Sequence, residues 1–172
     1  MKRLQIFVFG LLLLAVLFAV WVTKTKPGEI LTSYRFVAID APADKVWAVL
    51  TDISSYPSWN SYIVEASGTL RVGEKLKIVE EIDGRRNSHV VRVSRFDPTN
   101  RVLVWQGSSL LPALFQWSEW ISVDAVDANH SRVTLLITHQ GLLAHPYRKY
   151  NKNRDLHGFQ QFAESLKKKA ER

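Results

Sequence analysis

The stretch APADKVWAVLTDISSYPSWN, residues 41–60, decides how the rest of this sequence is interpreted. Pro42 suits the first turn of a helix, and the residues after it predict an amphipathic helix over Ala43–Leu50. The apolar residues at helical spacing are Val46, Val49, Leu50 and Ile53. Pro57 prevents a regular helix from continuing for more than a turn or two. The large side chain of Trp59 therefore falls in a short, broken segment, and the rest of the chain must explain why it is there.

Predicted β-strands dominate the sequence around this helix. A strand over residues 29–40 precedes the helix, because that segment alternates and is rich in β-branched and aromatic residues. Six further strands, each bounded by turn residues, are predicted over 62–67, 75–82, 88–96, 101–106, 115–123 and 131–140. From about Tyr150 to Ala170, apolar residues recur at spacings of three and four, which predicts a long helix. This helix is the only element large enough to cover the apolar face of a curved antiparallel sheet.

The order of these elements resembles the helix-grip fold of the START and birch-pollen-allergen (SRPBCC) superfamily. The residues that carry the resemblance are residues 41–60, GEKLKI (73–78), VSRFDPTNRVLVWQG (93–107) and HQGLL (139–143). The branch to which the chain is most similar is the polyketide cyclase/dehydrase and lipid-transport group, over roughly residues 30–170.

The resemblance implies an α+β fold, in which a curved antiparallel sheet of about seven strands wraps around a long C-terminal helix. It also implies a ligand that is a lipid, a quinone or another hydrophobic small molecule. Functions in this family are diverse, so the resemblance says more about fold than about chemistry. The chain departs from the family pattern at Ser61, where that branch often has proline, and at Glu119, where the family often has histidine.

The N-terminal stretch LQIFVFGLLLLAVLFAVWV, residues 4–22, is apolar apart from Gln5 and has basic residues on both sides. Its length matches a helix that crosses the hydrocarbon core. Large residues occupy the positions near its end where cleavage of a signal peptide requires small residues. The sequence therefore predicts an uncleaved transmembrane helix, which contacts membrane lipid, within an anchor and linker at residues 1–28. The short basic tail favours a globular domain, residues 29–172, that lies outside the cytoplasm.

The composition limits the possible partners. The net charge of +7 is clustered at the two ends of the chain, and no nucleic-acid motif accompanies it, so no nucleic-acid partner is predicted. An anionic membrane surface explains these charges better, and a solvated helix face remains an alternative. The chain has no cysteine, which excludes disulfides and thiolate metal sites. Its histidines lack metal-ligand spacing, so we predict no metal and no cofactor. A protein partner is unknown.

Several loops at one end of the predicted sheet are rich in large apolar residues. Antiparallel strands alternate in direction, so this end collects residues 58–60, 83–87, 107–115 and 141–146. We expect Trp59 to form one wall of an apolar rim around a cavity. The remaining rim residues are Leu110, Leu111, Leu114, Leu142 and Leu143. The alternative is that these side chains fold inward and close the end of the core.

Two polar residues interrupt apolar strand faces. Glu119 follows Phe115 and Trp117 in alternation, and His139 ends the face that begins at Val133. A hairpin with Ile121 near Ile137 would put Glu119 opposite His139. Such a pair could act as general acid and base or fix the polar end of a ligand. Two alternatives remain open. In one, Glu119 and His139 bond only to each other, as a buried ion pair or hydrogen-bonded pair. In the other, the predicted strand face is wrong by one residue.

The predicted ligand-binding set is Trp59, Asn60, Trp105, Phe115, Trp117, Glu119, His139, Phe159 and Phe162. Of the two tryptophans at opposite parity on one strand, we expect Trp117 to face inward and Trp120 outward. No phosphate loop or nucleophile motif accompanies Glu119 and His139, the two catalytic candidates.

Three functions fit these features. The first is a membrane-anchored module that binds a hydrophobic small molecule in an internal cavity. The second is a cyclase, dehydratase or hydrolase that uses Glu119 and His139. The third is a protein that binds no ligand and docks on a membrane subunit.

Overall fold

A computed structural model of the chain describes residues 2–25 and 28–172. Its helices are α1 (Lys2–Thr25), α2 (Ala43–Thr51), the 3-10 helix η1 (Ile53–Ser58) and α3 (Ala144–Ala170). Its strands are β1 (Leu31–Ile39), β2 (Ile63–Gly68), β3 (Lys75–Ile82), β4 (Arg85–Asp97), β5 (Val102–Ser108), β6 (Gln116–Ala125) and β7 (Ser131–Gln140). This is the element order that the sequence predicts.

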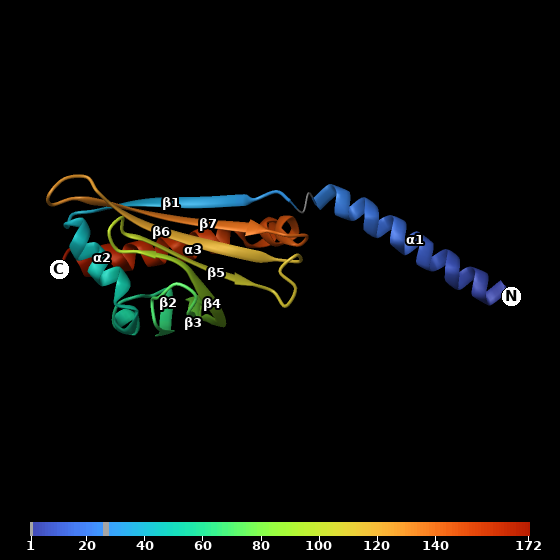
Figure 1. Ribbon diagram of the computed structural model, residues 1–172, viewed down its shortest axis with the longest axis horizontal. Helices are drawn as coiled ribbons and strands as arrows, with labels where there is room; N and C mark the ends of the chain where they lie inside the picture. The colour runs from blue at the N-terminus through green and yellow to red at the C-terminus, as the bar shows by residue number, and fades with distance from the viewer. Residues whose placement is uncertain (1, 26–27) are drawn as a thin grey trace.

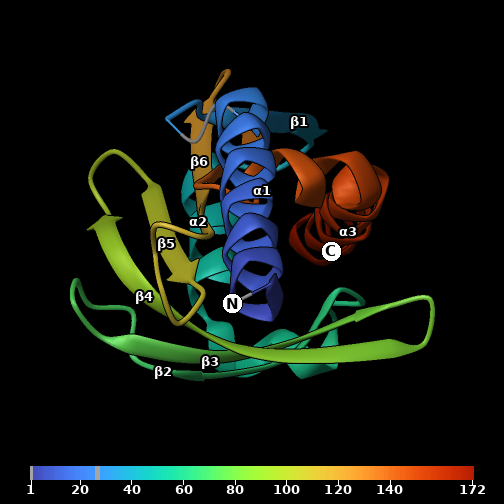
Figure 2. The same cartoon turned by 90° about the vertical axis from the view of Figure 1, so that its right-hand side faces the viewer.

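The seven strands form one sheet in the order β1-β7-β6-β5-β4-β3-β2, and every neighbouring pair is antiparallel. The sheet curves, and α3 lies along its concave side (Figures 1 and 2). The predicted α+β helix-grip architecture is therefore confirmed.

The core lies between the concave face of the sheet and one face of α3. From the helix, Phe159, Phe162 and Leu166 are buried against sheet residues such as Leu103 and Leu135. Nearer the middle of α3, a Cβ at position 158 would lie only 2.5 Å from the ring of Tyr62. Gly158 is therefore what allows that ring to lie directly on the helix, and it fixes one wall of the cavity described below.

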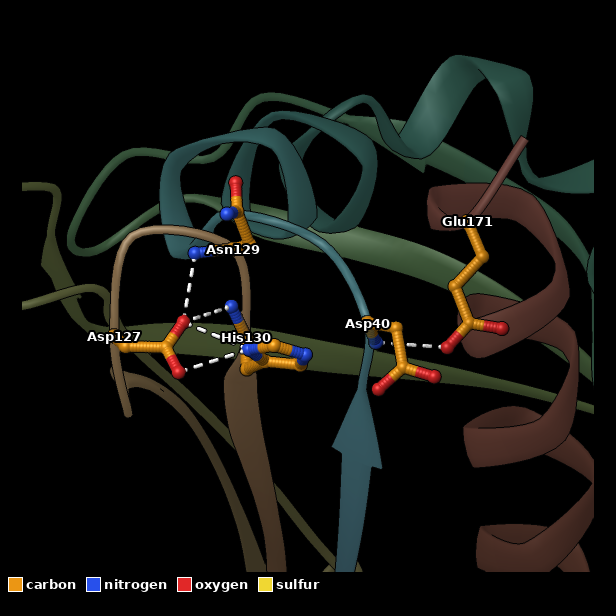
Figure 3. Close-up of polar contacts among 5 residues, drawn as sticks. All are labelled: Asp40, Asp127, Asn129, His130 and Glu171. Carbon is orange, nitrogen blue, oxygen red and sulfur yellow. Dashed lines mark hydrogen bonds and ion pairs between the residues drawn. The ribbon is translucent and has the colours of Figure 1, made fainter.

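Polar turns close the end of the sheet at which α3 terminates. In the β6–β7 turn, Asp127 Oδ1 accepts hydrogen bonds from the backbone N–H groups of Asn129 (2.8 Å) and His130 (2.9 Å). Nearby, the backbone N–H of Asp40 donates to Oε1 of Glu171 at 2.8 Å, which links the end of β1 to the end of α3 (Figure 3). These contacts hold the end of α3 against the sheet.

The N-terminal helix α1 extends away from the sheet (Figure 1), and the described side chains of its apolar stretch are exposed. The sequence correctly predicts a helix there. However, within residues 2–25 and 28–172 no helix is long and apolar enough to cross a membrane. The predicted transmembrane role of residues 4–22 is therefore not supported. Lys26 and Pro27, which belong to the predicted linker, lie outside the described residues.

Two predicted boundaries are wrong in a way that matters for the site. The helix α3 begins at Ala144, six residues before the predicted start, since Pro146 is tolerated in a first helical turn. Strand β4 begins at Arg85 rather than at residue 88, because it continues up to a tight turn at Asp83 and Gly84. The added segments carry Tyr147 and Asn87, and both of these residues line the cavity.

Candidate functional site

A cavity of about 180 Å³ lies between the concave face of the sheet and the first half of α3. The residues that line it are Tyr62, Glu80, Asn87, His89, Phe115, Trp117, Glu119, Ile137, His139, Tyr147, Arg154, Asp155 and Phe159. A much smaller hollow of about 10 Å³ adjoins it deeper in the core, at Tyr62, Glu119 and Phe159. Trp105 and Phe162 line only this deeper hollow. The cavity is thus apolar in its walls and carries several ionisable groups.

Aromatic rings form one wall of the cavity. The rings of Phe115 and His139 are stacked with their centroids 5.6 Å apart, and Tyr147 lies 4.6 Å from Phe115 and 4.8 Å from His139. Trp117 continues this wall, 5.9 Å from Phe115. These rings come from β6 and the residue before it, from β7 and from α3, so the wall exists only because the helix covers the sheet at this point. Offset aromatic surfaces of this kind favour a planar, apolar guest.

Carboxylates and histidines adjoin the aromatic wall, and His139 is itself one of its rings. Nε2 of His89 is 3.6 Å from Oε1 of Glu80, and Nε2 of His139 is 3.6 Å from Oδ2 of Asp155. Both distances are too long for direct hydrogen bonds. The hydroxyl of Tyr147 donates to Oδ1 of Asp155 at 3.2 Å. These groups therefore retain hydrogen-bonding capacity for a ligand.

Glu119 is the most deeply buried of the acids. Loss of hydration raises its pKa well above the usual range, and the negative charge of Glu80 raises it further. The indole N–H of Trp105 donates to Oε2 of Glu119 at 2.8 Å, and this hydrogen bond opposes part of the increase. At neutral pH Glu119 therefore holds a proton and is a potential donor within the cavity.

The pKa values of His139 and Asp155 shift in opposite directions. Burial lowers the pKa of His139 to about 4, with a smaller contribution from the positive charge of Arg148. Burial raises the pKa of Asp155 to about 6, while the hydrogen bond from Tyr147 and the charge of Arg154 oppose that increase. At pH 7 the imidazole is thus neutral and can accept a proton, and Asp155 is mostly ionised. A protonated acid and an unprotonated base therefore share one cavity, an arrangement suited to acid–base chemistry.

The predicted register between β6 and β7 is wrong by two residues. Ile121 pairs with Leu135, and Trp117 pairs with His139, so Glu119 faces Ile137 rather than His139. A five-residue loop between Ala125 and Ser131 sets this register. Because a shift of two residues preserves the face, Glu119 and His139 still both point into the cavity. The prediction that Trp117 faces inward is also confirmed, since Trp120 is 43% exposed on the outer side.

Trp59 and Asn60 lie away from the cavity. Trp59 packs on Tyr56 and Phe162, with ring centroids at 5.1 and 6.4 Å, and its indole N–H donates to Ser55. Asn60 is buried, and its side-chain oxygen accepts hydrogen bonds of 2.9 Å from the backbone N–H groups of Tyr62 and Ile63. The expectation that Trp59 forms a wall of the cavity rim is therefore wrong. Its aromatic surface closes the core beside η1.

The two leucine-rich loops do meet at one end of the sheet, as the sequence predicts. The backbone N–H groups of Leu142 and Leu143 donate to the carbonyl oxygens of Ala113 and Leu114, at 3.1 and 2.8 Å. Leu110 and Leu111 are exposed beyond this contact. None of the five predicted rim leucines lines the cavity itself.

Several residues that line the cavity are absent from the predicted ligand-binding set, although the sequence carries a signal for some of them. Glu80 interrupts the buried alternation of Leu76, Ile78 and Ile82, which is the same pattern that identified Glu119. Asp155 lies four residues before Phe159, on the helix face that turns toward the sheet. In the described part of the chain, no group of three or more His, Cys, Asp or Glu side chains is arranged to hold a metal ion.

With this geometry established, comparison with known proteins identifies the family. Residues 31–171 match the model of the family described as polyketide cyclase / dehydrase and lipid transport. The chain belongs to this family. No curated protein matches the sequence.

Members of the wider fold show the same architecture among solved structures. The Zhui aromatase/cyclase from Streptomyces sp. R1128 is similar with a TM-score of 0.70 and 18% identity, over 84% of this chain and 95% of that one. Norcoclaurine synthase from Thalictrum flavum, solved with dopamine and hydroxybenzaldehyde, gives 0.65 and 12%, over 86% and 90%. A START superfamily protein from Mycobacterium smegmatis gives 0.61 and 16%, over 81% and 97%. At these identities the similarity establishes the fold of this polyketide cyclase-like chain and not its substrate.

Proposed function

We propose that this domain binds a small, largely hydrophobic molecule of about one substituted aromatic ring in the cavity between the sheet and α3. The observation that carries the proposal is the cavity itself, about 180 Å³ with an aromatic wall and several buried polar groups. An engineered cavity of about 150 Å³ accommodates benzene, so a single substituted ring matches this volume. A long acyl chain does not match it.

The polar groups that line the cavity favour a guest that carries a hydroxyl or carbonyl group. Protonated Glu119 supplies a donor, and neutral His139 supplies an acceptor or a donor depending on its tautomer. A ligand oxygen would offset the cost of keeping these groups away from water. This explains why a hollow that is otherwise apolar contains ionisable residues.

The proposal is tested with 4-methylphenol and with palmitate, whose chain is too long for the cavity, using isothermal titration calorimetry on the full chain. We expect saturable binding of 4-methylphenol and none of palmitate. Glu119→Gln and His139→Ala are expected to weaken the binding. The matched controls Glu74→Gln and His130→Ala alter a half-exposed and an exposed residue, both outside the cavity, and should leave binding unchanged. Equal binding by all four variants, or no saturable binding by the wild type, would refute the proposal.

A second candidate function is acid–base catalysis on the bound molecule, of the cyclase or dehydratase type. The observation that favours it is the coexistence of a protonated Glu119 with a neutral His139 beside Asp155. In this function Glu119 would donate a proton to a substrate oxygen, and His139 would remove a proton from carbon. Loss of turnover in Glu119→Gln with ligand affinity retained would distinguish the enzyme from a binding module.

Neither function depends on a membrane anchor. The position of the domain outside the cytoplasm stays a prediction, and protease protection in intact cells would test it. Co-purification of a stable protein partner with an empty cavity would favour the docking role instead.

A further inference from the structure

The sheet divides near the cavity. Strand β4 pairs with β3 from Arg85 to Arg92, but its pairing with β5 begins only at Arg92, opposite Gln106. The β5–β6 hairpin continues past this point to the pair Ser108 and Gln116. The first part of β4 and the end of the β5–β6 hairpin therefore diverge. Figure 2 shows β4 curving away from β5.

A second hollow lies along this division, on the outer side of the sheet. It has a volume of about 380 Å³, and Val90, Arg92, Gln106 and Pro112 are among the residues that line it. Trp117 borders this outer groove and also borders the inner cavity. Among the residues that the structure describes, no other lines both hollows. The indole of Trp117 is thus the wall that the two hollows share.

The position of this indole depends on the residue opposite it. Trp117 pairs with Gly107 of β5, and a Cβ at position 107 would lie only 2.2 Å from Cζ2 of the indole. Only glycine lets the ring lie against the backbone of β5. From there the ring reaches His89 on β4, with centroids 5.8 Å apart in an edge-to-face arrangement. The side chain therefore bridges the division between the two parts of the sheet.

We propose that Trp117 sets the size limit of the ligand, as a partition that separates the inner cavity from the outer groove. This inference rests on the proposed binding function and deepens it. With the indole in place, the cavity accepts about one ring. Without it, the cavity and the groove become continuous, and a guest of two fused rings can extend through the division in the sheet.

The test compares 4-methylphenol with 2-naphthol by isothermal titration calorimetry on the full chain. In Trp117→Ala we expect affinity for 2-naphthol to rise by about tenfold or more relative to 4-methylphenol, the scale on which pockets discriminate small apolar groups. The matched control is Trp120→Ala, on the same strand but on its outer face. This control should keep the wild-type ratio of affinities for 4-methylphenol and 2-naphthol. Trp117→Phe, which keeps a smaller ring, should change the preference in the same direction and remains informative if the alanine variant does not fold.

The outcomes separate the size limit from the binding function. If the wild type binds 4-methylphenol but the Trp117 variants keep its preference, the partition is refuted and the binding function stands. If the wild type binds both probes with equal affinity, the partition is likewise refuted and the binding function stands. If the wild type binds neither probe, the binding function fails. In Gly107→Ala the indole must move, so a wild-type preference in that folded variant would also contradict the partition.

Discussion

Trp105 and Glu119 face one another across β5 and β6, and the indole N–H donates a 2.8 Å hydrogen bond to the carboxyl group inside the core. A buried acid is tolerated only when its polar atoms are bonded or its charge is removed. Here both conditions are met in part. One oxygen is bonded to Trp105, and burial together with the charge of Glu80 keeps the group protonated. Glu119 can therefore serve as a neutral donor without a buried cation beside it.

Glu119→Gln should remove a specific pH dependence of stability. The folded-state pKa of Glu119 is raised, so its proton stabilises the fold fully below about pH 4.5, the ordinary value. This stabilisation is lost as the pH rises through the raised pKa. The amide keeps the acceptor for Trp105 but does not titrate. We therefore expect the free energy of unfolding of the wild type, measured relative to the variant by urea denaturation, to decrease from pH 5 to pH 8.

The comparison between the two proteins cancels the titration of the groups that do not interact with Glu119. A difference in free energy that stays constant over this pH range would show that Glu119 titrates normally in the folded state. The variant Glu74→Gln, at a half-exposed position outside the cavity, should give no such difference.

His139 should titrate far below an ordinary histidine. Burial is the larger cause of its lowered pKa of about 4, and the positive charge of Arg148 is the smaller one. Arg148→Ala should therefore raise the pKa only part of the way toward 6.5, because burial remains. Nuclear magnetic resonance of the imidazole during an acid titration measures both values, with exposed Lys149→Ala as the control. A midpoint near 6.5 in the wild type would contradict the burial of His139.

The sequence predicts the fold well because the fold depends on periodicity. Alternation in seven segments and helical spacing after Tyr150 suffice to predict a sheet that one helix covers, whatever the exact boundaries. The same alternation identifies Glu119 and His139, since polar residues on an apolar face stand out. It also predicts that Trp117 and Trp120 point to opposite sides.

What the sequence does not predict depends on register and on contacts between distant segments. Alternation is unchanged by a shift of two residues, so it could not reveal that His139 faces Trp117 rather than Glu119. The role of Trp59 depends on where η1 packs against α3, which no local pattern specifies. The sequence pattern does not point to Tyr147, because the helix that it predicts begins only after Pro146, whereas α3 begins at Ala144.

Trp59→Ala should reduce stability and leave ligand binding intact. The indole packs on Tyr56 and Phe162 and lines no part of the cavity. Since the ring is half-buried, we expect a loss of about 2–3 kcal/mol in the free energy of unfolding, below the usual cost of a fully buried tryptophan. Urea denaturation measures the loss, and calorimetry with 4-methylphenol measures binding. A variant that is as stable as the wild type but binds poorly would restore Trp59 to the ligand site.

Asn60→Ala should also act on stability alone. Its side-chain oxygen satisfies the buried backbone N–H groups of Tyr62 and Ile63 where β2 begins. Removal of this acceptor should cost about 1–3 kcal/mol, because those groups are then buried without a partner. The control is Asn129→Ala, at an exposed turn position where the hydrogen bond runs through the backbone N–H. Equal stability of the two variants would contradict the assigned role of Asn60.

A chain that begins at Glu29 should fold and bind as the full chain does. Among the described residues, the buried core cluster lies within residues 39–170, and α1 extends away from it (Figure 1). Deletion of residues 1–28 should therefore leave the midpoint of urea denaturation and the affinity for 4-methylphenol unchanged. It should also remove the exposed apolar side chains of α1, which would lower aggregation during purification. Loss of folding in the shortened chain would show that the division between residues 28 and 29 is wrong, and that α1 stabilises the domain.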